Sequence, residues 1–216
     1  MKAIICGTKR ESIGRYIADE LVRDGWDVWL YSRIAENCDT GMMHERRADI
    51  TCEEHIAGLV TESGNPDLVV MSADTGGVFG SLKDIGACAV REFLDAKLLG
   101  SVLFVQRILL HGANTKIVFL AGKIGPKCEN FLLYGMVNSA IMSLVEEVNR
   151  HYQPRLEAYY LETPLISEST IAKQYAKVTG KSAGGCEPSV VLDSLREILQ
   201  DKHAQGFVPC VSGKVL

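Results

Sequence analysis

Short apolar runs alternate with segments of helical periodicity along most of this chain. The first run, Lys2 to Cys6, is apolar after its first residue, and apolar residues then recur every fourth position from Ile13 to Leu21. Such a run predicts a buried strand, and the repeat predicts a helix from Ser12 to Asp24 that stops at a glycine. The same reasoning predicts strands at Asp27 to Tyr31, Arg47 to Ile50, Asp67 to Ser72, Lys116 to Ala121, Arg155 to Leu161 and Phe207 to Val211. Further helices are predicted at Thr51 to Thr61, Val90 to His111, Phe131 to Tyr152 and Pro188 to Gln200. The helix from Thr51 is expected to use that residue as its N-cap, with Glu54 in the capping-box position.

The order of these elements indicates the fold class. Strands that are apolar throughout, separated by helices, are typical of a parallel sheet covered on both faces. With right-handed crossovers, the prediction is an α/β doubly wound parallel sheet of about seven strands in a single domain, residues 1–216. Such sheets bind ligands at the carboxyl ends of their strands, so the turn after Cys6 is the first place to look for a site.

Composition narrows the class of protein further. The chain has 216 residues, 47% hydrophobic and 23% charged, which is ordinary for a folded globular protein and excludes a disordered one. No apolar run reaches the length of a membrane span, and a formal net charge of −4 without a basic run predicts no nucleic-acid partner. Residues Met1 to Cys6 are strand-like and too short for a signal peptide. These features predict a cytoplasmic protein that binds neither membranes nor nucleic acid.

The cysteines and histidines predict no metal site. There are seven cysteines, an odd number at wide spacing and without a C-x-x-C pair, so we expect free and mostly buried thiols. The five histidines show no spacing typical of metal ligands.

The turn after the first predicted strand, Gly7 to Gly14, has the context of a phosphate-binding loop. It leaves a strand and enters a helix, where the free N–H groups and the helix dipole favour an anion. Gly7 would allow the tight turn and Gly14 the close packing of helix on strand. The residues of this glycine turn expected at a cofactor are Gly7, Thr8, Lys9, Arg10, Ser12, Ile13 and Gly14. A strand-to-helix turn with a packing glycine and no ligand is the alternative.

The end of the second predicted strand bears on the choice of dinucleotide. An acidic residue there holds the ribose hydroxyls of NAD, whereas this chain has Ser32 and Arg33, with Lys9 and Arg10 opposite. Arginine suits bidentate contact with a 2′-phosphate, so the pattern favours NADP(H) over NAD(H). The alternative is that these cations are solvated loop charges.

These features resemble the short-chain dehydrogenase/reductase family over nearly the whole chain. The glycine turn is similar to the family's T-G-x-x-x-G-x-G loop, one residue longer and with Ser12 in place of the middle glycine. Three further matches are Asp49-Ile50, similar to the adenine-contacting motif; Ser72-Ala73-Asp74, where the family has N-N-A-G; and Leu98-Leu99-Gly100 with Gln106 on the next helix. The resemblance implies a Rossmann-like fold, a nicotinamide cofactor, and a homodimer or homotetramer built through the long helices.

The resemblance also identifies candidate catalytic positions. The family's tyrosine falls on Tyr134, and its lysine, four residues later, falls on Asn138. Its serine falls on Ala121 or Gly122, and its asparagine, three residues before Gly100, falls on Lys97. The family uses the tyrosine as general acid/base and the lysine to lower the pKa of that phenol.

Two of these departures look like one exchange, with lysine and asparagine each standing in the other's place. We hypothesise that Lys97 supplies the cation to Tyr134 from the opposite helix, because its apolar helical row points it inward. Asn138, one turn after Tyr134, would hold the ribose or a water molecule. The alternative is that Lys97 reaches solvent and the exchange is coincidental.

The segment expected to cover the substrate departs from the family as well. It begins Glu162-Thr163-Pro164-Leu165, and the stretch Lys173 to Glu187 is rich in Gly, Ser and Lys, which suits either a mobile lid or a disordered loop.

Three functions are compatible with these patterns. The first is an NADP(H)-dependent oxidoreductase acting on a small carbonyl or alcohol, with Tyr134 as general acid/base. The second is a nucleotide-binding protein with altered or lost catalysis, serving as a sensor or partner subunit. The third is an isomerase or lyase that uses Tyr134 without hydride transfer. The fold alone does not choose among them.

Overall fold

An eight-stranded sheet forms the centre of the computed structural model, in the order β3-β4-β2-β1-β5-β6-β7-β8. The structure describes residues 1–9, 11–73, 80–112, 114–122, 131–167, 169–180, 185–202 and 206–209. The strands are β1 (Lys2–Cys6), β2 (Asp27–Ser32), β3 (Cys38–Thr40), β4 (Met43–Arg47), β5 (Leu68–Met71), β6 (Thr115–Gly122), β7 (Leu156–Thr163) and β8 (Gly206–Pro209). Neighbouring strands are parallel except for β3, which is antiparallel to β4. The doubly wound α/β prediction is confirmed, with one strand more than expected.

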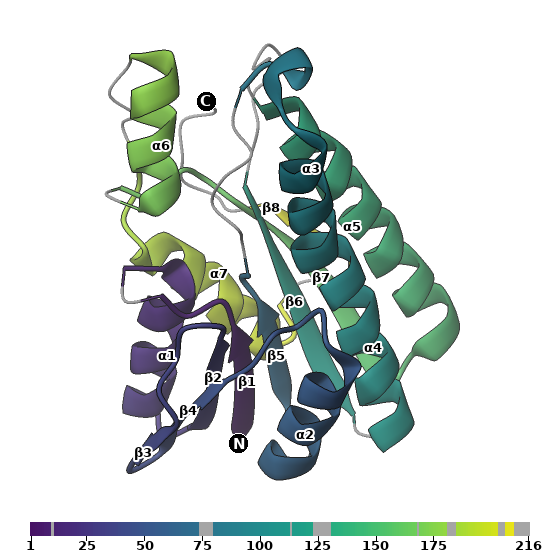
Figure 1. Cartoon of the computed structure of the whole chain (residues 1–216). Helices are drawn as coiled ribbons and strands as arrows, with labels where there is room; N and C mark the ends of the chain where they lie inside the picture. Colours follow the sequence, from purple (N-terminus) through teal and green to yellow (C-terminus); the bar gives the residue numbers. More distant parts are fainter. Residues whose placement is uncertain are drawn as a thin grey trace.

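Helices cover both faces of this sheet (Figure 1). They are α1 (Ile13–Arg23), α2 (Glu53–Ser63), α3 (Ala87–Leu94), α4 (Gly100–His111), α5 (Leu132–Tyr152), α6 (Thr170–Thr179) and α7 (Ser189–Leu199), with a 3₁₀ turn η1 (Leu82–Asp84) and a π-helical turn η2 (Asp95–Leu99). Alternate residues of β1 enter two separate cores, Ala3 and Ile5 with α1 and α7, Ile4 and Cys6 with α2, α4 and α5. Burial on both faces explains why the strands are apolar throughout.

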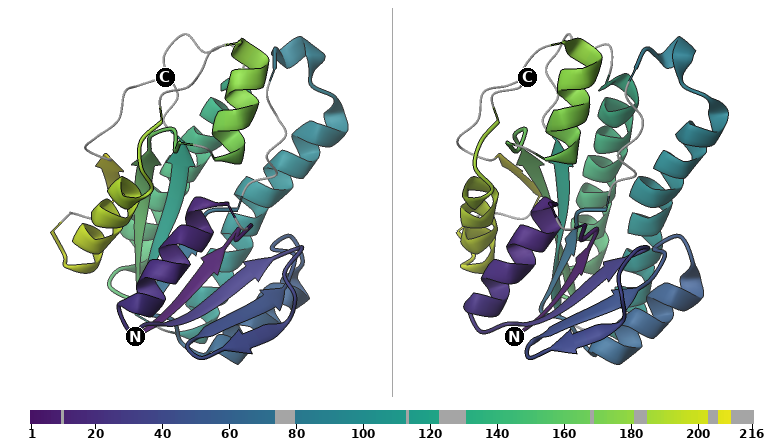
Figure 2. Two further views of the ribbon diagram at one scale, coloured as in Figure 1. Left: turned by 90° about the vertical axis from the view of Figure 1, so that its left-hand side faces the viewer. Right: turned by 60° about the vertical axis from the view of Figure 1, so that its left-hand side comes forward.

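Two helices extend beyond the carboxyl ends of the central strands. Figure 2 shows α6 and the start of α3 rising above the sheet, beyond the ends of its central strands. The order of strands reverses beside β1, which pairs with β2 on one side and β5 on the other. This is the position at which a doubly wound sheet forms its ligand crevice.

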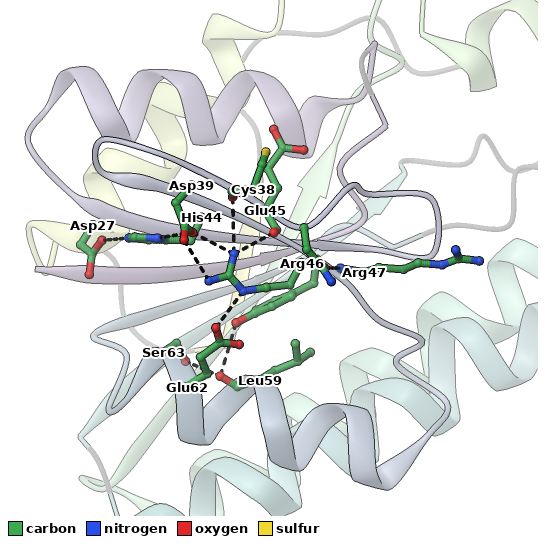
Figure 3. Close-up of polar contacts among 12 residues, drawn as sticks. Asp27, Cys38, Asp39, His44, Glu45, Arg46, Arg47, Leu59, Glu62 and Ser63 are labelled. Carbon is green, nitrogen blue, oxygen red and sulfur yellow. Dashed lines mark hydrogen bonds and ion pairs between the residues drawn. The ribbon is translucent and has the colours of Figure 1, made fainter.

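The predicted strand Arg47 to Ile50 is wrong. The structure has instead the polar hairpin β3–β4, which ends at Arg47. Arg46 forms ion pairs with Asp39 and Glu62 at 2.8 Å each. His44 forms hydrogen bonds with Asp27 and Asp39 at 2.9 and 2.8 Å (Figure 3). The polar side chains of β4 are therefore held by ion pairs, and a search for apolar runs misses this strand.

An aromatic ring underlies this charged cluster. Trp29 of β2 stacks on His44 with ring centroids 4.3 Å apart, and the Arg46 guanidinium lies 5.0 Å from the Trp29 ring centroid. Trp29 is 8% exposed, so the cluster seals the apolar core at this edge of the sheet.

The start of α2 also differs from the prediction. The helix begins at Glu53 after Cys52, which makes no side-chain capping bond. Thr51, the expected cap, instead donates its N–H and its hydroxyl to Asp49 Oδ1, at 2.9 and 2.8 Å. The nearby carboxylate competes successfully for the threonine, so the capping box with Glu54 does not form.

The helix predicted from Val90 to His111 is longer and not uniform. It begins at Ala87, and the π-helical turn η2 separates α3 from α4. The Gly100 N–H donates to the Asp95 carbonyl, five residues back, and the Ser101 hydroxyl donates to the Lys97 carbonyl. Turns of this kind occur mostly as single insertions in α-helices and frequently at functional sites.

In the C-terminal part, one helix was not predicted, and the last predicted strand is present in part. The lysine-rich stretch from Lys173 overlaps a helix, α6, capped by the Ser169 hydroxyl, which accepts from the Ala172 N–H at 3.1 Å. The last strand, β8, begins at Gly206, and the predicted continuation to Val211 lies outside the described residues.

The thiols are more exposed than expected. The five cysteines within the described ranges are free, and Cys38 and Cys88 are exposed whereas only Cys6 among them is buried. No helix in the described part of the chain is both long enough and apolar enough to cross a membrane. Among the same residues, no group of histidine, cysteine and carboxylate side chains could hold a metal ion.

Candidate functional site

A cleft with a volume of about 450 Å³ lies at the carboxyl ends of the strands around β1, where the strand order reverses. Its lining includes thirteen of the residues singled out by sequence: Gly7, Thr8, Lys9, Ser12, Ile13, Ser32, Arg33, Asp49, Ile50, Ser72, Ala73, Lys97 and Tyr134. The size is typical of small-molecule and cofactor sites. Arg10 and Asp74, also singled out by sequence, lie outside the described residues.

Close approach of two backbones explains Gly7. Its φ is +92°, and a Cβ built there would lie 2.5 Å from both the N and the Cα of Ala73. The Gly7 N–H donates to the Tyr31 carbonyl at 2.9 Å. Beside it, the Ser72 hydroxyl donates to the Cys6 carbonyl at 2.6 Å. The glycine turn is therefore pressed against the end of β5, and no side chain fits between them.

Gly14 and Ser12 shape the start of α1. A Cβ on Gly14 would meet the Ser72 Oγ at 2.4 Å and the Gly7 carbonyl oxygen at 2.7 Å. The Ser12 Oγ accepts from the Arg15 N–H at 3.2 Å, which makes this serine the N-cap of α1. The amides of the first turn of a helix have no acceptor within the helix, so the α1 terminus offers donors to an anion in the cleft.

The residue after β2, Arg33, is a cation that lies near both the cleft and a carboxylate. Arg33 is exposed and lines the cleft, as does Asp49, whose carboxylate is close enough to feel the charge of Arg33. Burial disfavours the charged form of Asp49, but hydrogen bonds from Thr51 and the charges of Arg33 and His55 together leave the pKa of this carboxyl below its ordinary value. Arg33 therefore faces an ionised carboxylate as well as the cleft.

Ile50 has a packing role that the sequence pattern alone does not reveal. A Cβ on Gly100 would lie 2.9 Å from the Ile50 Cδ1, so the side chain of Ile50 fills the space beside this glycine. The contact fixes the start of α4 against the loop that carries Asp49, and it explains the glycine of the Leu98-Leu99-Gly100 match.

Tyr134 lies in the first turn of α5 and lines the cleft. It is 5% exposed, and its ring packs between Phe93, at a centroid distance of 4.5 Å, and Phe131, at 6.1 Å. These contacts hold the ring of Tyr134 against two apolar side chains. The tyrosine thus faces the same cleft as the glycine turn, which is the arrangement that the resemblance implies.

Lys97 lies in η2, which packs against α5, and borders two cavities. One is the cleft, and the other is a pocket of about 10 Å³ that also includes Ser101 and Asn138. That volume is about what one water molecule needs, and the three polar side chains are the partners that a buried water requires. Lys97 and Asn138 therefore line the same small cavity behind the cleft, together with seven apolar residues.

Asn138 is 8% exposed and does not line the main cleft. Its Nδ2 donates to the Gly122 carbonyl at 2.9 Å, which fastens α5 to the end of β6. Of the two candidates for the family's serine position, Ala121 and Gly122, only Gly122 lines the cleft, and neither has a hydroxyl.

One hydroxyl near that position was not predicted. Thr163, the register partner of Gly122 on β7, is buried, lines the cleft and donates its hydroxyl to the Ala121 carbonyl at 3.1 Å. The signal that could have identified it is its place at the carboxyl end of a central strand, the edge where such folds bind ligands.

Comparisons with known proteins bear on the fold. No protein-family model matches the sequence, and no curated protein matches it either. Solved structures do match. A tyrosine-to-phenylalanine variant of ElxO with NADPH bound has a TM-score of 0.80 at 15% identity, covering 97% of this chain and 96% of that one.

Two further structures match over similar lengths. Serine dehydrogenase from Escherichia coli has a TM-score of 0.78 at 13% identity, covering 97% of this chain and 96% of its own. Aldohexose dehydrogenase from Thermoplasma acidophilum has a TM-score of 0.78 at 16% identity, covering 97% and 92%. The chain therefore has the fold of the short-chain dehydrogenase/reductases, which confirms the resemblance at the level of the fold.

Proposed function

We propose that this chain is an NADP(H)-dependent oxidoreductase of the short-chain dehydrogenase/reductase type, with Tyr134 as general acid/base for a small carbonyl or alcohol. The observation that carries the proposal is that the glycine turn and Tyr134 line one continuous cleft at the strand switch point. The NADPH bound by the ElxO variant, on the same fold, supports the choice of cofactor.

The residues of the cleft fit this cofactor. The glycine turn at the cleft and the capped terminus of α1 suit a pyrophosphate, held by Gly7, Thr8, Lys9, Arg10, Ser12, Ile13 and Gly14. Ser32 and Arg33 would hold a 2′-phosphate, Asp49 and Ile50 the adenine, and Ser72, Ala73 and Asp74 the adjoining ribose. When bound, the cofactor supplies or accepts a hydride.

Tyr134 would exchange the proton. A phenol has an ordinary pKa near 10, which is too high for proton exchange near neutral pH. A nearby cation must lower this pKa if the hydroxyl is to give or take a proton near neutral pH. Lys97 is the cation that we assign to this task, as a positioning residue acting through Tyr134, because both line the cleft and η2 packs on α5.

The small cavity behind the cleft supports an exchanged pair. Lys97, Ser101 and Asn138 meet there, so one water molecule could link the ammonium to the amide. Asn138 would then orient that water and, through Gly122, the end of β6. In this arrangement Lys97 at the family's asparagine position and Asn138 at its lysine position would still act at one site.

If Lys97 supplies the cation to Tyr134, removing its charge should change the pH dependence of the reaction. Lys97→Met should raise the apparent pKa of Tyr134 by about one unit or more, because the loss of a nearby cation disfavours the phenolate. The rising limb of alcohol oxidation against pH should then move to higher pH, with kcat lower by about tenfold at neutral pH. Both changes would be measured in pH profiles of kcat.

The double variant Lys97→Asn with Asn138→Lys serves as the control. It restores the family's arrangement, so its pH profile should return toward that of the wild type, and kcat should recover to within about fivefold. An unchanged pH profile in Lys97→Met would contradict the assignment of Lys97.

Cofactor preference gives a second prediction. Arg33→Gln should weaken NADPH binding by about tenfold or more, because a charged hydrogen bond contributes about 1.5–3 kcal/mol, while NADH binding stays within about twofold. Binding would be measured by fluorescence titration. Arg47→Gln, an exposed arginine outside the cleft, is the matched control. Equal losses for both cofactors would point to Arg33 as a solvated charge.

One observation favours a second candidate function. With Asn138 in the lysine position and its amide used on Gly122, the chain could bind the nucleotide as a sensor or partner subunit without turnover. Such a protein would bind NADPH but would not oxidise it with any member of a panel of small aldehydes and ketones.

Assembly and location complete the proposal. The long helices α4 and α5 expose large apolar side chains, namely Leu110, Leu132, Met136 and Met142, which suits a homodimer or homotetramer formed through them. Exposed free thiols at Cys38 and Cys88 suit a reducing compartment, the cytoplasm.

A further inference from the structure

Helix α6 contacts both ends of the cleft. Lys173 Nζ lies 2.9 Å from Glu11 Oε2, in the glycine turn. On the other side, the ring centroid of Tyr175 lies 5.6 Å from that of Phe131, the residue that packs on Tyr134. The helix therefore spans from the proposed phosphate site to the proposed reaction site.

The base of the segment that carries α6 is fixed. The Cys186 N–H donates to the Leu165 carbonyl at 2.8 Å, and the Ser167 N–H donates to the Cys186 carbonyl at 3.0 Å. Gly185 packs so closely that a Cβ would lie 2.4 Å from the Ser167 nitrogen. The two ends of this segment meet here, so the position of α6 above this point depends on the contacts of the helix itself, which include the Lys173–Glu11 ion pair.

Glu11 places a negative charge in the turn that is proposed to bind the cofactor phosphates. It lines the cleft within a turn whose task would be to hold an anion, and a carboxylate there repels phosphate. The hydrogen bond and the charge of Lys173 hold the pKa of Glu11 below its ordinary value, so this exposed carboxylate stays ionised and is partly neutralised by a cation. That cation comes from α6, more than 160 residues later in the chain.

We infer that Lys173 is a positioning residue for the cofactor phosphates: it cancels the Glu11 carboxylate and holds α6 against the glycine turn. Phosphate binding and the docking of α6 then strengthen each other, because coupling between two binding events is reciprocal. The inference rests on the proposed function, since it takes the pyrophosphate of NADPH as the ligand.

Fluorescence titration with NADPH tests the effect on affinity. Lys173→Gln should weaken binding by about two- to fivefold at low salt, the size expected for an exposed ion pair, and the loss should vanish near 1 M salt. Glu11→Gln together with Lys173→Gln should restore the affinity to within about twofold, because the repelling charge is gone as well. Lys177→Gln, one turn further along α6 and without an ion pair among the described residues, should bind as the wild type does.

Hydrogen exchange of the α6 amides in the free protein tests the docking separately. Lys173→Gln and Glu11→Gln should each accelerate exchange by a similar factor, and the double variant should exchange no faster than either. Wild-type affinity in Lys173→Gln, or α6 exchange that is the same in all variants, would overturn the inference while leaving the proposed function intact. A wild-type chain that does not bind NADPH would instead overturn the proposed function.

Discussion

Tyr134→Phe should lower kcat for the reduction of a small carbonyl by about 10²- to 10⁴-fold, the range that a positioned general acid contributes. The variant removes one hydroxyl and keeps the ring, which packs between Phe93 and Phe131, so these apolar contacts are preserved. NADPH affinity should therefore stay within about threefold of the wild type, and the free energy of unfolding within about 1 kcal/mol. Steady-state oxidation of NADPH, fluorescence titration and urea unfolding check the three expectations.

A second tyrosine on the same helix provides the control for this experiment. Tyr152 lies at the far end of α5, is 45% exposed and is not part of the cleft, so Tyr152→Phe should be as active as the wild type. If Tyr134→Phe kept more than about a third of the activity, Tyr134 would not be the proton donor, and an enzyme that turns over without it would have to use another acid.

Gly7→Ala should cost about 3 kcal/mol or more in free energy of unfolding and should weaken NADPH binding by more than tenfold. The backbone at φ +92° strains any L-residue by about 1–3 kcal/mol, and the added methyl group would sit 2.5 Å from the Ala73 backbone. Either the glycine turn or the end of β5 must move, and both line the cleft. Urea unfolding and NADPH titration measure the two effects.

Gly25→Ala separates strain from close approach. Gly25 has a comparable φ of +83°, but nothing lies within 4 Å of its would-be Cβ. In this variant the free energy of unfolding should fall only by the strain of the backbone conformation, about 1–2 kcal/mol, and NADPH should bind as it does to the wild type. Equal destabilisation of the two variants would mean that the contact between Gly7 and Ala73 contributes nothing.

The central sheet could be predicted because its strands are buried on both faces, which leaves a simple signature in the sequence. The hairpin β3–β4 could not, since its residues are held by charge. Arg46 reaches Glu62, sixteen positions away, and His44 reaches Asp27, seventeen away. No local pattern encodes pairings at such separations.

Some residues of the candidate site could likewise be predicted from the sequence, and others could not. Gly7, Gly14 and Ser12 could be identified because a strand-to-helix turn demands particular residues in particular places. Thr163 and Glu11 could not, because their importance comes from neighbours brought by the fold, Gly122 in the first case and Lys173 in the second.

The π-helical turn η2 has a consequence for how the periodicity of this helix is interpreted. Each residue of an α-helix advances the side-chain direction by about 100°, so one extra residue in a turn shifts the phase of everything beyond it. The apolar row that predicts an inward Lys97, namely Val90, Leu94, Lys97, Ser101 and Ile108, assumes a regular helix through this turn. The two halves of that row follow separate helical wheels, and Lys97 sits at the junction between them. Helical periodicity therefore does not by itself give the direction of the Lys97 side chain, whereas the position of this residue in the lining of the cleft does.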